Sequence, residues 1–336
     1  MKVCLLTRFF NYKGTGVTRI ATEVLKELEN QGHEVVKIST NGKSLYSYFF
    51  YTAVEIPLRY PKTGVDVYHA LATMEAMWLP RNKSIATILD LFTTTNPDRA
   101  GAGMGYEKWK LLIGRKYFEF GSHVASKCRF IVCISDKTKQ DVIQCLNIKE
   151  DKIKVIKLGI QDDLEPLNIK HKRLTIGTLG QLDKRKRIDL LIRQFKASNI
   201  DADLLIAGQG MDRPMLEALA DGDKRIKFLG LVPNDKLNEF YNSLDVFAFP
   251  SFIEGYGLPP VEVMACKKPV VLMSDVIMPD EIKNRCILTE SLRHTFDHIY
   301  DLPKVNQDDN YTFAKSHNWK KCVNEYVELY KEIMSG

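Results

Sequence analysis

Two glutamates flank a glycine-bearing turn in residues 250–265, which read PSFIEGYGLPPVEVMA. Glu254 precedes the turn, and Glu262 stands in the apolar stretch that follows it. Pro259 and Pro260 suit the first turn of a helix, where a backbone amide has no partner within the helix. A helix that begins there presents free amides that favour an anion or a sugar hydroxyl. Those amides belong to Tyr256, Gly257 and Leu258.

This pair of carboxylates suits the ribose of a nucleotide. A carboxylate accepts a hydrogen bond from each of two hydroxyls, at about 1.5–3 kcal/mol per bond. The segment follows a predicted strand, so both side chains can face the carboxyl end of a sheet, where open α/β sheets bind ligands. Alternatively, Glu262 is a solvated helix residue, although its apolar neighbours predict a buried helix in which an unpaired glutamate is costly. The pair therefore predicts a ligand site.

A basic run, LDKRKR at residues 182–187, comes shortly after a predicted strand at Leu174–Gly180. A solvated loop is the usual interpretation of such a run. Its position after a strand instead favours contact with a phosphate, because loops at the carboxyl ends of parallel strands border the ligand. Cations held there would stabilise the negative charge that builds on a diphosphate when a sugar leaves it.

Short apolar segments alternate with segments of helical period along the whole chain, which predicts parallel sheets joined by crossover helices. The fold class is therefore α/β, with two doubly wound units. A polar segment with a proline, residues 159–166, predicts the linker between them. The predicted strands are Lys2–Leu6, Glu34–Ser39, Val65–His69, Ser84–Leu89, Phe130–Ser135, Lys154–Lys157, Leu174–Gly180, Asp203–Ala207, Ile226–Leu229, Val246–Phe249 and Val270–Met273. The predicted helices are Thr18–Gln31, Ile188–Ala197, Met211–Ala220, Leu237–Leu244 and Pro259–Ala265.

Length and composition set outer limits on the class of protein. The chain has 336 residues, more than a single core usually supports, so we expect two domains with the active site in a cleft between them. With 45% hydrophobic and 27% charged residues, it is neither disordered nor collagen-like. The net charge of +6 suits a phosphate-bearing ligand or an anionic membrane, but it is too small for a dedicated nucleic-acid-binding protein.

Seven scattered cysteines without a C-x-x-C pair indicate reduced, mostly buried thiols. The first apolar run is too short for a signal peptide, and no stretch approaches the ~20 apolar residues of a membrane-spanning helix. We therefore expect a cytoplasmic protein. His294 and His298 have no acid or cysteine pattern beside them, so no metal site is predicted.

A series of short motifs runs through residues 229–271. They are GLVP at 230–233, DVF at 245–247, PS at 250–251, EGYGLP at 254–259, EVMAC at 262–266 and PVV at 269–271. Together they resemble the donor half of a family 4 retaining glycosyltransferase. Weaker matches extend the resemblance over the chain, at GTGVTR (14–19), VCISD (132–136), GQG (208–210) and a C-terminal helix that begins at Trp319.

The resemblance implies the GT-B fold, in which two facing Rossmann-like domains have a cleft between them. Residues 1–163 would form the acceptor-binding domain and residues 164–317 the donor-binding domain. Residues 318–336 would form a helix that packs back on the first domain. The chain would be a hexosyltransferase that moves a hexose from a nucleoside diphosphate sugar to a hydroxyl of a glycan or lipid-linked acceptor, with no cofactor and no required metal.

The resemblance also assigns roles to residues. Glu262 would bind the ribose, and Glu254 with the amides after it would hold the sugar and the diphosphate. Arg185 and Lys186 would face the diphosphate, and Gly16 would approach it from the first domain. The implied donor-binding residues are Gly16, Arg185, Lys186, Glu254, Gly255, Tyr256, Gly257, Leu258 and Glu262. From the residues alone, Gly14 and Gly16 could equally form only a tight turn before a helix.

The first half departs from the family pattern where the family commonly shows Thr-x-His-Asp. Here residues 87–90 read TILD, so Leu89 replaces the histidine that usually contacts the transferred sugar. Asp90 and His69, which both stand at the ends of predicted strands, are the candidates to compensate. A core or capping histidine is the alternative for His69. The implied catalytic residues are Glu254, Lys186, Asp90 and His69.

A second departure is Gln181, where the family often has an arginine that contacts the diphosphate. Glutamine can donate a hydrogen bond but carries no charge. Together with Leu89, this residue leaves open a catalytically weak or inactive subunit that only binds a sugar nucleotide. A GT-B sugar-nucleotide epimerase is the enzymatic alternative.

Aromatic and basic residues concentrate at 46–51 and in a predicted helix at 106–120. These segments could dock on the inner face of an anionic membrane to reach a lipid-linked acceptor. The alternative is that their apolar members pack against the first sheet while the lysines remain solvated.

Overall fold

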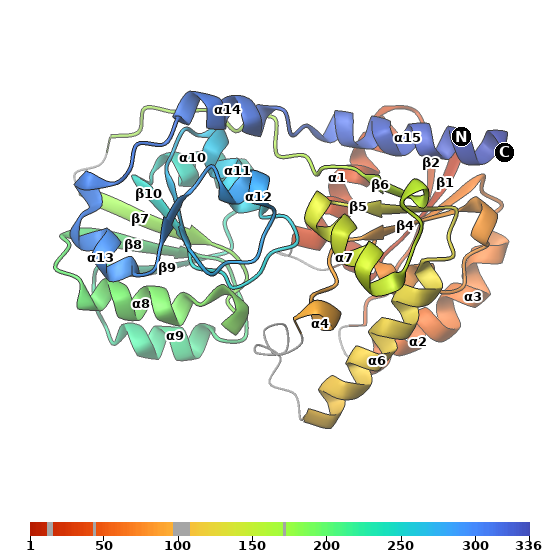
Figure 1. Ribbon diagram of the computed structural model, residues 1–336, viewed down its shortest axis with the longest axis horizontal. Coiled ribbons are helices and arrows are strands. Elements are labelled where there is room, and N and C mark those ends of the chain that lie inside the picture. Colours follow the sequence, from red (N-terminus) through yellow and green to blue (C-terminus); the bar gives the residue numbers. More distant parts are fainter. Residues whose placement is uncertain (12–15, 43–44, 97–107, 171–172) are drawn as a thin grey trace. The chain divides into compact units, whose positions relative to one another are not determined.

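The computed structural model describes residues 1–11, 16–42, 45–96, 108–170 and 173–336 (Figure 1). Its contacts divide the chain into unit 1, which comprises Met1–Gly159 and Trp319–Gly336, and unit 2, which comprises Ile160–Asn318. The first boundary lies in the polar segment predicted as the linker. The last helix, α15 (Trp319–Ser335), is part of unit 1 although it follows unit 2 in the chain.

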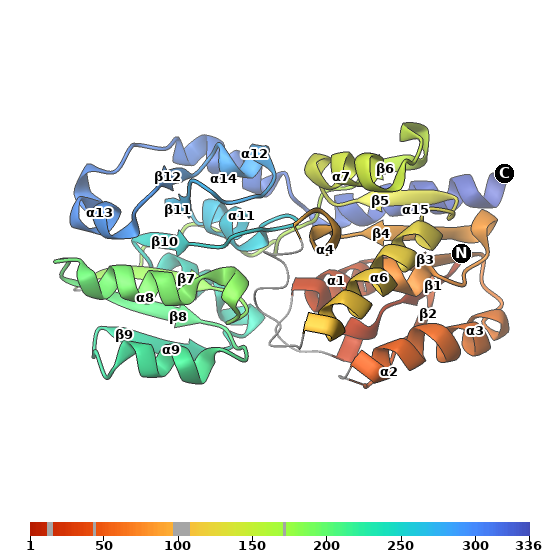
Figure 2. The same ribbon diagram turned by 60° about the horizontal axis from the view of Figure 1, so that its bottom comes forward.

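The described residues of unit 1 form a six-stranded parallel sheet in the order β2-β1-β3-β4-β5-β6 (Figure 2). The order reverses between β1 and β3, as in other doubly wound sheets. Helix α15 contacts both α1 and β3. The strands are β1 (Lys2–Leu6), β2 (Glu34–Ile38), β3 (Val67–Ala70), β4 (Ser84–Ile88), β5 (Phe130–Cys133) and β6 (Ile153–Val155). The other helices include α1 (Gly16–Asn30), α2 (Leu45–Phe50), η2 (Tyr51–Glu55), α3 (Ile56–Arg59), α4 (Phe92–Thr95), α6 (Lys108–Ala125) and α7 (Asp136–Leu146), along with five 3₁₀ turns, η1 (Arg8–Asn11), η3 (Tyr60–Lys62), η4 (Thr73–Ala76), η5 (Arg81–Lys83) and η6 (Glu150–Lys152).

Unit 2 contains a second six-stranded parallel sheet, in the order β12-β11-β10-β7-β8-β9 (Figure 2). Read from β9, this is the order 3-2-1-4-5-6 of a dinucleotide-binding sheet, with the reversal between β7 and β10. The strands are β7 (Leu174–Leu179), β8 (Ala202–Ala207), β9 (Ile226–Gly230), β10 (Val246–Phe249), β11 (Val270–Met273) and β12 (Ile287–Thr289). The helices are η7 (Lys184–Lys186), α8 (Ile188–Ala197), α9 (Arg213–Ala220), η8 (Asn234–Lys236), α10 (Leu237–Asn242), α11 (Leu258–Ala265), α12 (Asp280–Lys283), α13 (Leu292–Asp297), η9 (Ile299–Asp301) and α14 (Gln307–Lys315).

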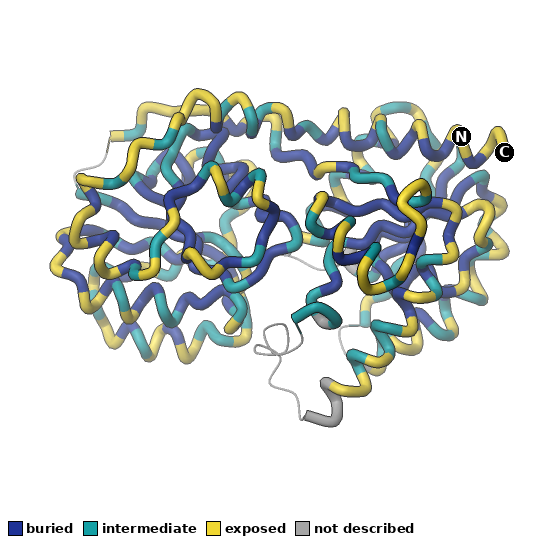
Figure 3. Tube along the Cα trace, viewed as in Figure 1, coloured by how far each residue is buried: buried dark blue, intermediate teal, exposed yellow. Residues whose placement is uncertain are grey.

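Both sheets are covered by helices on their two faces, which explains the nearly unbroken apolar runs of the strands. Every residue of β10 (VFAF) and β11 (VVLM) is buried (Figure 3). Helix α11 is buried on most of its circumference, because it lies against β10 and β11 on one side and α14 on the other. These buried strands hold the loops that follow them in fixed positions.

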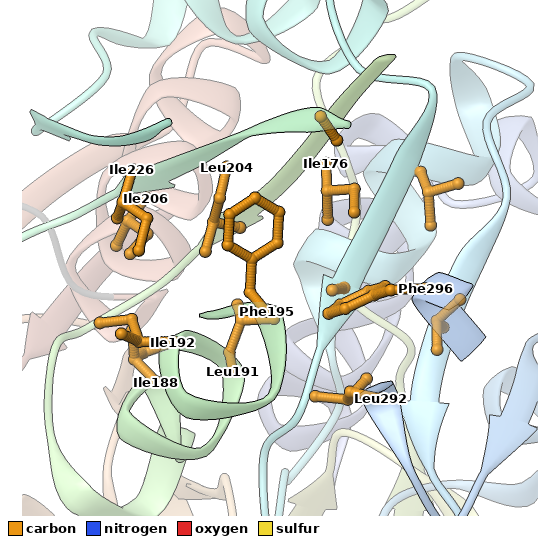
Figure 4. Close-up of a cluster of buried hydrophobic side chains, with 14 of the residues drawn as sticks. Ile176, Ile188, Leu191, Ile192, Phe195, Leu204, Ile206, Ile226, Leu292 and Phe296 are labelled. Carbon is orange, nitrogen blue, oxygen red and sulfur yellow. The ribbon is translucent and has the colours of Figure 1, made fainter. Parts of the chain in front are cut away.

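The face of the unit 2 sheet opposite α11 is covered by α8, α9 and α13 (Figure 1). Phe195 of α8 and Phe296 of α13 are at most 1% exposed, and their rings meet edge to face with centroids 6.2 Å apart. Both pack on strand residues such as Ile176 and Leu204 (Figure 4). This cluster anchors the strands from which the candidate site extends.

Short elements in the last third of unit 2 escape the sequence prediction. β12 has three residues, and α12, α13 and α14 have four, six and nine. A strand of that length shows no alternation, and the helices α12 and α13 are too short to show a helical period. The positions of β12, α13 and α14 are set by packing on β11, α8 and α11, which the local sequence does not encode.

Replacing Phe195 by alanine should destabilise unit 2 by about 3–5 kcal/mol, because the change leaves a cavity in a fully buried cluster. Denaturant unfolding, followed by hydrogen exchange of the β7 and β8 amides, measures the loss. The matched control is Tyr300→Ala in the same unit, since Tyr300 is 87% exposed. Equal stability of the two variants would contradict the position assigned to Phe195.

Candidate functional site

The candidate site lies where the strand order of unit 2 reverses. β7 and β10 are neighbours in the sheet, with Val246 opposite Ile176. From β7 the chain continues through α8 to β8 on one side of this pair, and from β10 it continues through α11 to β11 on the other side. The loops at the carboxyl ends of these two strands, residues 180–187 and 250–257, therefore border the crevice in which doubly wound sheets bind ligands. The predicted basic run and the predicted glycine-bearing turn are these two loops.

Glu254 is the residue on which the two loops converge. It is 9% exposed, and its Oε1 atom accepts hydrogen bonds from Lys186 Nζ at 2.5 Å and from the guanidinium Nη1 of Arg185 at 3.1 Å. The Ser251 hydroxyl donates a third hydrogen bond to the same oxygen. The structure thus brings together three of the predicted site residues through one carboxylate.

The charges in this cluster shift one another's protonation equilibria. Burial by itself would raise the pKa of Glu254, but the nearby cations Lys186 and Arg185 outweigh it and hold the pKa below its ordinary value. Burial lowers the pKa of Lys186, and the ion pair with Glu254 opposes that change. Lys186 also lies over the ring of Phe249, 4.7 Å from its centroid, which favours the ammonium form.

The turn before α11 has the backbone shape that its glycine predicts. Gly257 caps the helix with φ at +102°, a region that other residues rarely adopt, and an added Cβ would lie 2.7 Å from Met278 Cε. Tyr256 and Leu258 on either side are buried. The amides of Gly257 and Leu258 have no hydrogen-bond partner among the described residues, so they are available to a ligand.

Glu262 lies within α11 and is completely buried. Its Oε2 accepts a 2.7 Å hydrogen bond from the hydroxyl of Tyr241 in α10. The two predicted glutamates therefore have different partners. The solvated-helix alternative for Glu262 is wrong, because α11 is enclosed by the sheet and α14.

A third loop, at residues 208–210 after β8, packs tightly on the basic loop. Gly208 has φ at +124°, and a Cβ added to it would lie 1.8 Å from the carbonyl oxygen of Gly180. A Cβ on Gly210 would lie 2.1 Å from the carbonyl oxygen of Leu182. Both glycines are thus required by the close approach of two backbones, which fixes the loop that carries Arg185 and Lys186.

Arg187 is a positioning residue whose role the sequence did not predict. It adopts a left-handed conformation with φ at +50°, and its guanidinium donates to the carbonyls of Pro250 and Ser251, at 2.5 and 3.0 Å. It also forms a bidentate pair with Asp275. Arg187 therefore ties the loop after β7 to the loop after β10. Its place in the LDKRKR run was the only signal in the sequence.

The predicted site residues of unit 1 lie at the carboxyl ends of its strands. Gly16 is exposed and is the first residue of α1, with open space around it, whereas Gly14 lies outside the described residues. Asp90 follows β4, and its Oδ1 accepts a 3.3 Å hydrogen bond from the amide of Phe92. The roles of Gly16 and Asp90 stay predictions.

His69 in β3 is completely buried and has partners at both ring nitrogens. Nδ1 lies 2.6 Å from the hydroxyl of Tyr330 in α15, and Nε2 lies 2.8 Å from the hydroxyl of Thr87 in β4. Burial lowers the pKa of His69 to about 3, so the ring is neutral at physiological pH. These contacts favour the core histidine over the catalytic one, and the catalytic role stays a prediction without a contact that supports it.

In the parts of the chain that the structure describes, no group of three or more His, Cys, Asp or Glu side chains could hold a metal ion. Likewise, none of the described helices combines the length and the apolar sequence needed to cross a bilayer.

Part of the chain matches a known family. Residues 159–287 match the model of the family described as Glycosyl transferases group 1. O-antigen chain mannosyltransferase B of Escherichia coli is 25% identical over 245 residues, which are 64% of this chain and 64% of that protein. An uncharacterized glycosyltransferase of Methanocaldococcus jannaschii is 33% identical over 163 residues, 43% of this chain and 42% of that protein. The chain thus spans less than two thirds of the length of these relatives.

Solved structures resemble the chain over nearly its whole length. A sucrose-phosphate synthase from Thermosynechococcus elongatus has a TM-score of 0.79 at 14% identity and covers 100% of this chain and 99% of its own. Anabaena Alr3699/HepE, in complex with UDP-glucose, has a TM-score of 0.72 at 14% identity and covers 99% of this chain and 100% of its own. The α/β class and the GT-B fold are therefore confirmed. Family 4 membership stays a prediction.

The stabilisation of Glu254 by its cations should depend on pH. Above the ordinary pKa of 4.5, Glu254 is ionised in the folded and the unfolded chain, and the full stabilisation is present. Below it the unfolded chain takes up the proton first, because the folded-state pKa is lower, and the stabilisation is lost as pH falls through the folded-state pKa. The difference in unfolding free energy between wild type and Glu254→Gln, about 1–3 kcal/mol at neutral pH, should shrink below pH 4.5.

Urea unfolding at a series of pH values measures this difference. Glu239→Gln is the control, because Glu239 pairs with Lys236 on the exposed surface and its loss should change stability little at any pH. A difference for Glu254→Gln that stays constant in acid would show that the charge of Glu254 does not stabilise the folded chain.

Proposed function

We propose that the chain is a retaining glycosyltransferase that moves a hexose from a nucleoside diphosphate sugar to a hydroxyl of a glycan or lipid-linked acceptor. The observation that carries this proposal is the convergence of Lys186 and Arg185 on Glu254 at the reversal of the unit 2 sheet. The match of residues 159–287 to glycosyl transferases group 1 supports it. So do mannosyltransferase relatives and a structural neighbour in complex with UDP-glucose.

In this proposal the cations of the basic loop act on the leaving group. As the bond between the sugar carbon and the diphosphate oxygen breaks, negative charge grows on that oxygen. Lys186 and Arg185 already lie in a site of low exposure, held by Glu254, so they stabilise this charge without a costly rearrangement. They also supply the positive charge for which a metal would otherwise be needed.

The turn before α11 would contact the rest of the donor. The amides of Gly257 and Leu258, together with Gly255 and Tyr256, suit the sugar hydroxyls and the diphosphate at a helix start. Glu262 would accept hydrogen bonds from the ribose. Gly16 at the start of α1 would approach the diphosphate.

Retention places the acceptor on the same side of the sugar as the leaving group. The acceptor oxygen bonds to the sugar carbon as the diphosphate departs, and the acceptor proton passes to the departing diphosphate oxygen. No strong protein base is needed in this scheme, which is consistent with the leucine at position 89. Asp90 remains the candidate to orient the acceptor or sugar. We assign no substrate contact to His69, because both of its ring nitrogens have partners within unit 1.

We also propose a cytoplasmic location. All seven cysteines are free thiols, and six of them are buried. Burial raises the pKa of Cys4, Cys133, Cys266 and Cys286 to about 12, so these thiols are unreactive at neutral pH. Such a set suits a reducing compartment.

A thermal-shift screen identifies the donor. Nucleoside diphosphates and their hexose conjugates are added one at a time, and a ligand at 100 times its dissociation constant should stabilise the chain by about 2.7 kcal/mol. Incubation of the identified donor with candidate acceptors then tests transfer, and the anomeric configuration of the product tests retention. Conversion of the donor to another sugar nucleotide without an acceptor would instead identify an epimerase.

Lys186→Ala should lower kcat/KM by about 100- to 1000-fold, because it removes a preorganised cation from the leaving group. Lys184→Ala is the matched control, since Lys184 belongs to the same basic run but is exposed and has no contact with Glu254. Donor hydrolysis and transfer are measured for both variants. If Lys186→Ala retains wild-type activity, the leaving-group role of the loop is wrong.

Glu262→Gln separates a ribose contact from a purely structural role. The amide oxygen can still accept the hydrogen bond from Tyr241, so the fold should persist, but a charged acceptor for the ribose is lost. We expect the nucleoside diphosphate to bind about 10-fold more weakly by calorimetry, with an unfolding temperature close to that of the wild type. Unchanged binding would remove the ribose assignment.

A further inference from the structure

The exposed apolar side chains of unit 1 concentrate on two helical segments. In α6, Leu112, Ile113 and Phe120 are each more than half exposed. At 100° per residue these three side chains and Lys116 lie within about 100° of one another around the helix. Tyr117 lies at the edge of this group, whereas Phe118 turns to the other side and packs against the core of the unit. The helix therefore presents an apolar strip with a lysine in its middle to solvent.

The second segment runs from α2 through η2 to α3. Tyr46, Phe50, Val54 and Leu58 recur at every fourth position and are all exposed, and Phe49 beside them is exposed as well. Tyr51 and Ile56 of the same segment are completely buried. The expectation that the apolar members of these segments pack on the first sheet thus holds for the inward residues only. Residues 106–107 and the side chain of Trp109 lie outside the described residues.

The two strips belong to one surface. The rings of Phe49 and Tyr117 lie 5.2 Å apart, and the hydroxyls of Thr52 and Tyr117 are 2.5 Å apart. Figure 2 shows α2, α3 and α6 along one side of unit 1. We call this surface the apolar face, made of Tyr46, Phe49, Phe50, Val54, Leu58, Leu112, Ile113 and Phe120.

Most of the net positive charge of the protein lies in the segments that carry the apolar face. Residues 45–62 and 108–127 together contain seven lysines and arginines and two glutamates, a net charge of +5, against +6 for the whole chain. Lys62, Lys116 and Lys127 are exposed there. Aromatic and aliphatic side chains bordered by basic ones are the composition of a surface that lies in the interface of an anionic membrane.

We propose that the apolar face docks on an anionic lipid bilayer. The positive charge of the apolar face favours an anionic bilayer over a second copy of the chain as its partner. A symmetric pair of chains joined through this face would bring two surfaces of the same positive charge together, which opposes association. Lysine is also depleted at the core of protein interfaces, yet Lys116 stands in the middle of the α6 strip. Acidic lipid headgroups pair with the basic residues while the apolar side chains enter the boundary of the acyl chains.

This inference goes beyond the proposed function, because lipid binding needs neither a donor nor turnover. It agrees with the lipid-linked option for the acceptor. The full chain without any sugar nucleotide is mixed with vesicles of phosphatidylcholine containing 30% phosphatidylglycerol, or with phosphatidylcholine vesicles alone, and the bound fraction is measured by co-sedimentation. We expect binding to the anionic vesicles, weaker binding to the neutral ones, and a decrease with added salt.

Two variants separate the contribution of the basic side chains to vesicle binding from that of the apolar side chains. Lys116→Glu should weaken binding to anionic vesicles roughly 25-fold, because each charge near such a surface changes binding about fivefold, and the substitution removes a positive charge and adds a negative one. The double variant Phe50→Ser/Leu112→Ser should weaken binding to both kinds of vesicle. Lys224→Glu and Tyr300→Ser, at exposed positions of unit 2, are the matched controls and should bind like the wild type.

All five substitutions replace exposed side chains, and unchanged thermal unfolding and nucleotide stabilisation confirm that each of the four variants is folded. The proposal is overturned if the wild type does not bind anionic vesicles, or if the face variants bind as well as the controls. It is also overturned if sedimentation shows a dimer that the Phe50→Ser/Leu112→Ser variant dissociates and vesicles remain unbound, since the face would then join two copies of the chain. Loss of vesicle binding with retained transfer to a soluble acceptor separates this proposal from the proposed function.

Discussion

The candidate site depends on one buried carboxylate that holds two cations. Removing charges from water costs several kcal/mol per ion, so such a group persists only where attraction and hydrogen bonds offset that cost. Oε1 of Glu254 meets this condition with donors from Ser251, Arg185 and Lys186. Removal of any one of these side chains would leave a buried charged or polar group of the others without its partner, so the cluster behaves as a unit. It fixes the loops after β7 and β10 against each other before any ligand arrives.

The contacts around this cluster also hold the loops after β7 and β10 in place. Arg187 holds the backbone of the second loop, and Gly208 and Gly210 allow a third loop to press on the first without a side chain between them. All three loops follow parallel strands of one sheet, so their shared location is a consequence of the strand order. The charged side chains of the site therefore extend from loops that the buried sheet holds in place. Such fixed charges are the condition for electrostatic preorganisation.

The sequence predicted those parts of the fold that local pattern encodes. Val246–Phe249 and Val270–Met273 were found with the predicted bounds, because a strand buried on both faces is an apolar run between turns. The convergence of the basic loop and the glycine-bearing turn followed from their positions after strands. What could not be predicted depends on distant partners. The role of Arg187 needs a left-handed backbone and carbonyls 63 residues away, and the burial of His69 needs Tyr330, 261 residues later in the chain.

The return of α15 to unit 1 makes unit 2 an insertion within unit 1. The chain passes from unit 1 to unit 2 after Gly159 and returns after Asn318, and these two connections lie side by side. The amide of Ile160 donates a hydrogen bond to the carbonyl of His317 at 3.0 Å, and Gly159 closely approaches Trp319. During synthesis, unit 2 is complete while unit 1 still lacks the helix whose Tyr330 reaches His69. Unit 2 can thus fold on the ribosome before unit 1 is complete. For protein engineering, residues 160–318 form a cassette that could be exchanged between related hosts through a single pair of adjacent junctions.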